Sequence, residues 1–411
     1  MPRFSVTYSV PASAATQARD KAFEICVEQT VEFPFDLIPV RWIRERLVGR
    51  VETVARLTPG RYAVKISYDE ATVGGEATQF LNVLFGNTSI KPGIRIERIS
   101  PSRGVRRALS GPRFGVRGVR RQLGVNGRPL LCSALKPMGL SAQELADLAY
   151  RFALGGTDLI KDDHGLVDQY FAPFEDRLRC CVAAVRRANR ETGGRCRYVP
   201  NVTADGAQTL ERARAARRAG AGGVIISAAL TGFAAMRELA RDERVGLPVF
   251  FHPAFAGTFT ASPHSGISHL ALYGQLARLF GADASIFPSF GGRFSFTPDQ
   301  CRVVVEGCRM RMAGIKPCLP APGGGIGFET VAELVSFYGP DTLFLIGGGL
   351  FRYSRDITKA CRDLRAAVLQ ATARQRIAGR PDRTAVPGIP HGTAFSVLIG
   401  RQKKAPIDST S

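Results

Sequence analysis

Most of the chain, from residue 129 onward, repeats one pattern, and this repeat limits the possible folds more than any other feature. Eight short runs rich in Val, Ile, Leu and Phe alternate with stretches of helical periodicity. The runs cover residues 130–137, 157–163, 196–203, 222–228, 247–254, 284–289, 316–325 and 343–349. Eight strand–helix units are the number that closes a parallel barrel. An open doubly wound sheet is the alternative, but no GxGxxG follows the first run. We therefore expect a (β/α)8 barrel over residues 126–375.

The first part of the chain, residues 1–125, lacks this repeat and predicts a separate α+β domain. Residues 4–10 and 62–68 alternate between apolar and polar side chains as strands do, and residues 14–27 fit a helix. The Arg- and Gly-rich stretch 91–128 is interpreted as a connecting segment. Residues 376–411 are polar, contain several Pro and Gly, and are interpreted as a C-terminal tail.

Composition narrows the class of protein. The chain is 45% hydrophobic and 22% charged, with a net charge of +21 that comes from 47 Arg against 9 Lys. Because zinc-finger spacing and aromatic RNA-binding motifs are lacking, we interpret this charge as a solvated face that attracts anionic substrates, and we do not expect nucleic-acid binding. No apolar run is long enough to span a membrane, and no apolar signal segment follows Met1. We expect a cytoplasmic protein without a membrane partner.

Polar side chains follow several of the apolar runs, where the carboxyl ends of barrel strands carry catalytic groups. The candidates are Lys136, Lys161, Asp163, His164, Asn201, His252 and Ser289. Two glycine triplets, 323–325 and 347–349, end the last two runs. This fold often binds phosphate there, because glycine lets backbone N–H groups approach an anion. Tight turns alone are the alternative explanation of the triplets.

The lysines allow more than one chemistry. Lys161 with Asp163 predicts either an ion pair or a metal site, and the metal site requires a modified lysine, such as a carbamate, to offer oxygen to Mg²⁺. Lys136 fits a general base, a group that stabilises an enolate, or a simple phosphate ligand. His252 fits an acid–base group, a hydrogen-bond donor or a structural histidine.

The motif Gly155-Gly156-Thr157-Asp158-Leu159-Ile160-Lys161-Asp162-Asp163, the preceding Lys136-Pro137 pair and Asn201-Val202-Thr203-Ala204 resemble the large subunit of ribulose bisphosphate carboxylase (RuBisCO). The resemblance implies an N-terminal α+β (ferredoxin-like) domain before the barrel. It also implies a homodimer in which Glu28 and Asn87 reach the partner's site. Lys161 matches a carbamylated lysine that binds Mg²⁺ with Asp163 and the residue at His164. Lys136 and His252 match catalytic residues. Phosphate or substrate contacts are implied for Asn201, Ser289, Gly324, Gly325, Gly347 and Gly348.

Departures from this pattern change the expected reaction. His164 stands where the family has a glutamate metal ligand, and the segment 290–295 lacks the loop lysine that assists carboxylation. The chain is therefore similar to the non-carboxylating, RuBisCO-like (form IV) proteins. We expect an enzyme, a lyase or isomerase, that forms an enolate on a monophosphorylated keto-sugar derivative and does not fix CO₂.

The expected substrate is a phosphorylated 3-oxo sugar acid of the 3-oxo-isoapionate 4-phosphate type, which would be decarboxylated or transcarboxylated. The alternative is an enolase or isomerase that acts on methylthio-pentulose phosphates in sulfur salvage. An alternative of another class is a non-catalytic protein that binds phosphorylated ligands or nucleic acid.

Overall fold

The computed structural model describes residues 2–292, 294 and 296–377. Most of the tail expected at 376–411 and two residues of the 290–295 segment, Arg293 and Ser295, therefore lie outside the described residues. The chain divides into two compact units, Met1–Thr372 and Ala373–Ser411. The elements described below belong to the first unit, except for the end of the last helix.

Eight parallel strands form the expected barrel. They are β5 (Leu130–Leu135), β6 (Leu159–Asp162), β7 (Arg197–Val199), β8 (Val224–Ile226), β9 (Val249–Phe251), β11 (Ala284–Pro288), β12 (Leu319–Gly323) and β13 (Leu343–Ile346). Their order in the sheet is β7-β6-β5-β13-β12-β11-β9-β8. A parallel bridge between Asn201 and Ile225 joins the two end strands and closes the ring. The prediction of a (β/α)8 barrel is confirmed.

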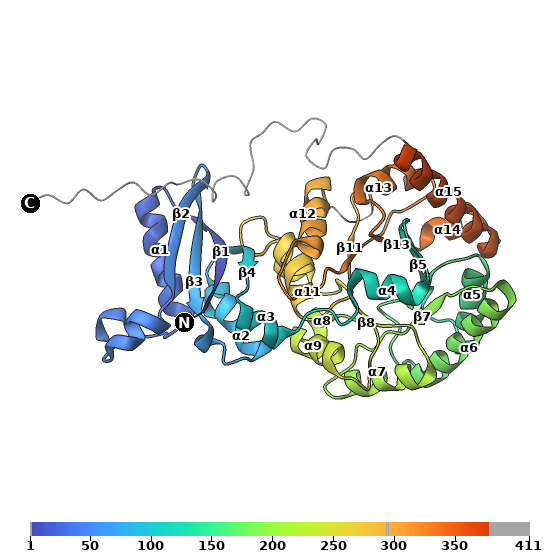
Figure 1. Ribbon diagram of the computed structural model, residues 1–411, viewed down its shortest axis with the longest axis horizontal. Coiled ribbons are helices and arrows are strands. Elements are labelled where there is room, and N and C mark those ends of the chain that lie inside the picture. The colour runs from blue at the N-terminus through green and yellow to red at the C-terminus, as the bar shows by residue number, and fades with distance from the viewer. Residues whose placement is uncertain (1, 293, 295, 378–411) are drawn as a thin grey trace, which may run out of the picture. The chain divides into compact units, whose positions relative to one another are not determined.

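Helices follow the strands and cover the outside of the ring (Figure 1). They are α5 (Ala142–Leu154), α6 (Phe174–Thr192), α7 (Gln208–Ala219), α8 (Ala228–Thr231), α9 (Phe233–Arg241), α10 (Gly257–Thr260), η5 (Leu270–Leu276), α11 (Ala277–Leu279), α12 (Pro298–Arg309), α13 (Val331–Tyr338), α14 (Gly348–Tyr353) and α15 (Ile357–Ile377). Helix α5 begins at a capping box, in which Ser141 and Glu144 satisfy each other's backbone N–H groups. None of the helices in the described part of the chain is long and apolar enough to cross a bilayer.

The N-terminal region contains four strands that pair with one another in antiparallel fashion. Its elements are β1 (Arg3–Pro11), α1 (Ala15–Glu28), η1 (Phe35–Leu37), η2 (Ile43–Leu47), β2 (Arg50–Thr58), β3 (Arg61–Asp69), η3 (Glu70–Thr72), α2 (Ala77–Phe85), η4 (Asn87–Ile90) and β4 (Arg95–Ser100). The main elements follow the order β-α-β-β-α-β, and the strands lie in the order β4-β1-β3-β2. The ferredoxin-like α+β fold is therefore confirmed.

One sequence interpretation was wrong, and one predicted helix begins later than expected. The stretch 91–128 is no mere connecting segment, because it holds β4 and the helices α3 (Arg103–Leu109) and α4 (Gly115–Leu123). Helical periodicity also predicts a helix over residues 266–280, but its first two residues form a short strand, β10 (Gly266–Ile267), which pairs in parallel with β4, and helix η5 begins only at Leu270. Gly266 has a φ of +92°, a conformation that a helix does not accommodate. A barrel loop thus supplies one edge strand of the N-terminal sheet.

Candidate functional site at the carboxyl ends of the barrel strands

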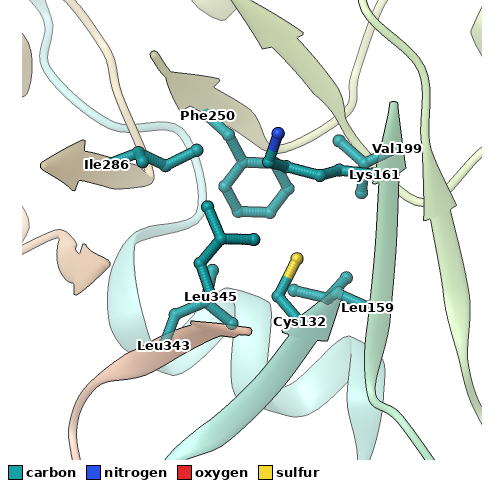
Figure 2. Close-up of a pocket in the computed structure, with 8 residues that line it drawn as sticks. All are labelled: Cys132, Leu159, Lys161, Val199, Phe250, Ile286, Leu343 and Leu345. Atoms are coloured by element: carbon teal, nitrogen blue, oxygen red, sulfur yellow. The ribbon is translucent and has the colours of Figure 1, made fainter. Parts of the chain in front are cut away.

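Strand β6 directs its last side chains to opposite faces, because side chains alternate along a strand. Lys161 is only 3% exposed and points into the barrel. It lies among apolar side chains that include Cys132, Val199 and Phe250, around a cavity of about 10 Å³ (Figure 2). A space of this size holds about one water molecule. Burial disfavours the charged ammonium and lowers the pKa of Lys161, an effect that the nearby Asp163 carboxylate only partly offsets.

Asp162, the next residue, faces away from the barrel interior and anchors the strand end. Its carboxylate accepts hydrogen bonds from Arg177 Nε at 3.1 Å, from the Tyr198 hydroxyl at 2.6 Å and from the Asn201 backbone at 3.0 Å. Arg177 and Asp162 are both fully buried. Because the charged groups satisfy each other, this network holds the end of β6 in place. Asp162 was not predicted as a site residue, although alternation along 159–163 places it on the face opposite Lys161.

Beyond the strand end, Asp163 contacts two other candidates, Lys136 and His164. Its Oδ1 lies 3.0 Å from Lys136 Nζ and 3.4 Å from His164 Nδ1. Burial alone would raise the pKa of Asp163, but hydrogen bonds from His164 and Lys136 and the charge of Lys161 outweigh it. The pKa of this carboxyl consequently lies well below its ordinary value. Asp163 is therefore a stable carboxylate that orients the Lys136 ammonium.

His252 follows β9 and completes the cluster. Its ring stacks on the ring of His164, with centroids 4.7 Å apart and planes inclined by 14°. Burial, followed by the charges of Lys161 and His164, lowers the pKa of His252 well below its ordinary value. Nδ1 of His252 accepts a hydrogen bond from the Ala254 N–H at 3.1 Å, so the neutral ring carries its proton on Nε2. His252 is thus a neutral hydrogen-bond donor.

Two candidate substrate ligands have hydrogen bonds within the protein. The Asn201 side-chain amide donates to the carbonyls of His164 at 2.9 Å and Leu166 at 3.0 Å, which positions the loop after β6. The Ser289 hydroxyl is buried and lies 3.1 Å from the Tyr338 hydroxyl. Their roles as substrate ligands stay predictions, because protein atoms already take up these bonds.

The glycine candidates differ in what surrounds them. Gly324 and Gly325 have φ angles of +78° and +87°, and a Cβ at Gly325 would lie 2.3 Å from Gly292 Cα, so backbone geometry accounts for both. The φ angles of Gly347 and Gly348 do not lie in the positive, left-handed region. A Cβ at either position would meet nothing within 4 Å. Glycine at these two positions leaves space in front of the backbone, as an anion site requires.

Glu28 and Asn87, which were expected to act across a dimer, lie together in the N-terminal domain. Asn87 Nδ2 donates to Glu28 Oε1 at 3.1 Å and to Glu32 Oε1 at 2.8 Å. The end of α1 and the start of η4 thus present one polar cluster. This proximity fits two residues that serve the same site, although their contact with a partner stays a prediction.

The side chains as they stand do not fit Mg²⁺. No three His, Cys, Asp or Glu side chains within residues 2–292, 294 and 296–377 gather so as to hold a metal ion. Asp163 Oδ1 is taken by Lys136 and His164, and Lys161 Nζ donates to the Asp162 carbonyl at 2.9 Å. Mg²⁺ prefers several oxygen ligands, whereas this site supplies one carboxylate among two lysines and two histidines. The expected cofactor stays a prediction that depends on a modified Lys161.

The fold and this cluster define a (β/α)8-barrel protein whose charged site lies at the carboxyl ends of β5, β6 and β9. Residues 115–293 match the catalytic domain of the ribulose bisphosphate carboxylase large chain. The chain belongs to this family, among its RuBisCO-like members. It is 40% identical over 357 residues to ribulose bisphosphate carboxylase-like protein 1 of Rhodopseudomonas palustris, covering 87% of this chain and 95% of that protein.

Two further relatives support this assignment. The 5-methylthioribulose-1-phosphate isomerase of Rhodospirillum rubrum is 38% identical over 374 residues, which cover 90% of this chain and 98% of that enzyme. The crystal structure of a RuBisCO-like protein from Rhodopseudomonas palustris is 38% identical and superimposes with a TM-score of 0.81, covering 90% of this chain and 98% of that one. The predicted resemblance is confirmed.

Proposed function

We propose that this protein is an isomerase or enolase that forms an enolate on a methylthio-pentulose phosphate. The observation that carries the proposal is the cluster of Lys136, Asp163, Lys161 and His252, which combines a buried amine with two hydrogen-bond donors. The isomerase relative acts on such a compound, as its name states. This choice reverses the order of the two substrate classes that the sequence alone favoured.

The residues of the cluster can take different roles in enolisation. Lys161, whose pKa burial lowers, is the group best able to lose its own proton and accept one from the carbon next to the carbonyl. The electrons of the broken C–H bond move to the carbonyl oxygen. The Lys136 ammonium, oriented by Asp163, and the Nε2–H of His252 then stabilise the negative oxygen. A proton then moves from the hydroxyl of the neighbouring carbon to this oxygen, so that the carbonyl forms at the neighbouring carbon. Return of the first proton to the former carbonyl carbon gives the isomer. The backbone at Gly347 and Gly348 would hold the phosphate.

Exposed apolar side chains near the cluster favour a substrate with an apolar tail. Met138, two residues after Lys136, is 50% exposed, and its Cε is close enough to Gly165 that a Cβ there would lie 2.5 Å away. Phe255, three residues after His252, is 59% exposed and has a φ of +65°. Backbone strain of this kind in a residue other than glycine concentrates at ligand-binding positions. A methylthio group suits such a surface better than a carboxylate does.

The second candidate remains decarboxylation or transcarboxylation of a phosphorylated 3-oxo sugar acid. One observation favours it, since the site holds two lysines against the single carboxylate Asp163. Such an excess of positive charge would attract a substrate with an additional carboxylate.

A substrate comparison tests these proposals. The purified protein is incubated in D₂O with 5-methylthioribulose 1-phosphate or 3-oxo-isoapionate 4-phosphate, with and without Mg²⁺ and bicarbonate. NMR then follows the replacement of hydrogen by deuterium beside the carbonyl and the formation of product. Exchange and isomerisation of the methylthio compound are expected. CO₂ release from the sugar acid alone would establish the second candidate, and exchange with neither compound would refute the enolising function.

A further inference from the structure

A second charged depression lies at the other end of the barrel, away from the catalytic cluster. Helix α4 closes this end, because Val116, Val119 and Leu123 pack in one apolar cluster with residues that begin the barrel strands, such as Leu130 and Leu319. The opposite face of α4 and the segment before β12 border a groove of about 520 Å³. We call it the floor groove. Its volume is typical of a site for a small molecule.

The floor groove is lined by four cations and, among the described residues, by no carboxylate. The cations are Arg113, Arg117, Arg121 and Lys316. Arg117 and Arg121 are exposed and stand one turn apart on α4. Neither makes a side-chain hydrogen bond or ion pair within residues 2–292, 294 and 296–377. Like charges at this spacing repel each other, so an anion between them would stabilise the folded protein.

Two carboxylates that contact α4 already have partners outside Arg117 and Arg121. Asp283 accepts hydrogen bonds from the backbone N–H groups of Phe114 at 2.8 Å and Gly115 at 2.6 Å. Asp341 pairs with Arg120, the residue before Arg121 on α4, with 2.9 Å between Oδ1 and Nε. The positive charge of Arg117 and Arg121 is therefore left for a ligand.

The wall of the groove is held in a fixed position. The Val116 N–H donates to the Pro317 carbonyl at 3.0 Å, and Lys316 Nζ donates to the Arg113 carbonyl. A Cβ at Gly115 would lie 2.8 Å from the same Pro317 carbonyl oxygen, so α4 approaches the segment before β12 more closely than other residues would allow. A preformed wall lowers the entropic cost of binding.

We propose that the floor groove binds a small polyanion that carries two or more phosphate or carboxylate groups. Arginine is suited to such a ligand, because its planar guanidinium donates two parallel hydrogen bonds to one phosphate or carboxylate. The groove is of small-molecule size and its cations gather at one concave place, which favours a compact ligand over a nucleic-acid strand. This site is separate from the phosphate contacts proposed at Gly347 and Gly348.

The test measures binding of tripolyphosphate by isothermal titration calorimetry to the full chain and to R117Q/R121Q. The double variant is expected to weaken binding by about tenfold or more, because two charge-assisted contacts are lost. The matched control is R217Q/R218Q, which removes two exposed arginines from the end of α7. The control should retain the wild-type affinity, and turnover should be the same in all three proteins.

Three results would overturn the proposal. The first is that tripolyphosphate does not bind to the wild type. An equal loss in both double variants is the second, since it would indicate attraction to the overall charge of the protein. The third is binding of a 20-nucleotide single-stranded RNA through Arg117 and Arg121 while tripolyphosphate does not compete. Loss of turnover in a Lys136→Ala variant, with tripolyphosphate binding retained, would separate this site from the proposed catalytic one.

Discussion

The rings of His164 and His252 lie face to face, 4.7 Å between centroids, and connect the end of β6 to the end of β9. Two protonated imidazoles would repel each other at this distance, which is one reason why the pKa of His252 is lowered, after burial and the charge of Lys161. His164 occupies the place where the RuBisCO pattern has a carboxylate. The site is consequently poor in anionic ligands and rich in nitrogen donors, an arrangement suited to stabilising a negative oxygen.

Replacement of Lys161 by methionine should abolish turnover without unfolding the protein. The side chain lies among apolar residues, where a buried charge costs free energy and an apolar residue of similar length does not. The melting temperature is expected to be equal to that of the wild type or higher. Circular dichroism against temperature and the NMR exchange assay measure the two effects. Retained exchange in a folded Lys161→Met protein would eliminate Lys161 as the base.

Replacement of Lys136 by alanine should lower kcat by about 10²–10³-fold, the usual cost of losing one donor to a developing oxyanion. Lys136→Arg keeps the charge beside Asp163 and should recover part of this loss. Steady-state kinetics on both variants measure the difference. If Lys136→Ala changes only KM, the ammonium serves in substrate binding and not in enolate stabilisation.

Met138 should determine the choice of substrate. Met138→Lys places a charge beside the cluster and is expected to lower kcat/KM for the methylthio compound by about tenfold, because an apolar contact is lost and a charge must be desolvated. Met138→Leu retains the apolar contact and serves as the control. Equal effects of the two substitutions would show that Met138 does not contact the tail of the substrate.

Asp283 should make stability fall as the pH rises from about 4 to 6. Burial raises the pKa of Asp283 to about 6, against its hydrogen bonds from Val249, Gly115 and Phe114. The folded protein therefore retains a proton that the unfolded chain has lost. This contribution is fully present below about pH 4 and is lost as the pH passes 6, a change of about 3 kcal/mol.

Urea unfolding at several pH values measures this change in wild type, in Asp283→Asn and in the surface control Glu243→Gln. The asparagine variant should lose this part of the pH dependence, and the control should keep it. An identical slope in wild type and Asp283→Asn would contradict the assignment.

Glu28→Ala and Lys136→Ala should complement each other if the active site is shared across a dimer. Each variant alone is expected to be nearly inactive. Random mixing by co-refolding makes half of the dimers mixed, and one of the two sites in each mixed dimer has both residues intact. The mixture should therefore recover about a quarter of the wild-type activity. Activity no greater than the sum of the two parents would show that Glu28 does not act across the interface.

The strands of the barrel and the charged residues that follow β5, β6 and β9 could be predicted, because apolar runs and the polar residues after them are local features of the sequence. The helix α4 was not predicted in this way, because only three apolar residues, Val116, Val119 and Leu123, mark its buried face, and three arginines lie between them. Its apolar face is explained only by the barrel end that it covers. The stretch 91–128 was interpreted as a connecting segment because of its Arg and Gly content. The spacing of its apolar residues would have predicted the helix.

Side-chain partners within the site were less predictable still. The sequence places Lys161, Asp163 and His164 on one strand end, but only the fold shows that Asp163 meets Lys136 and that His164 stacks on His252. These partners come from strands far apart in the chain. The role of Asp162 also depends on the fold, because its partner Arg177 lies on the helix that follows β6.

The parallel pairing of Gly266–Ile267 with β4 has a practical consequence for protein engineering. One edge strand of the N-terminal sheet lies in the loop that begins just after His252, so the two domains share a piece of chain. A chimera that joins the N-terminal domain of one relative to the barrel of another at residue 125 would inherit a foreign edge strand. Segment 262–268 should be transferred together with the N-terminal domain if the hybrid is to fold, and grafts at this boundary should be planned as two crossovers.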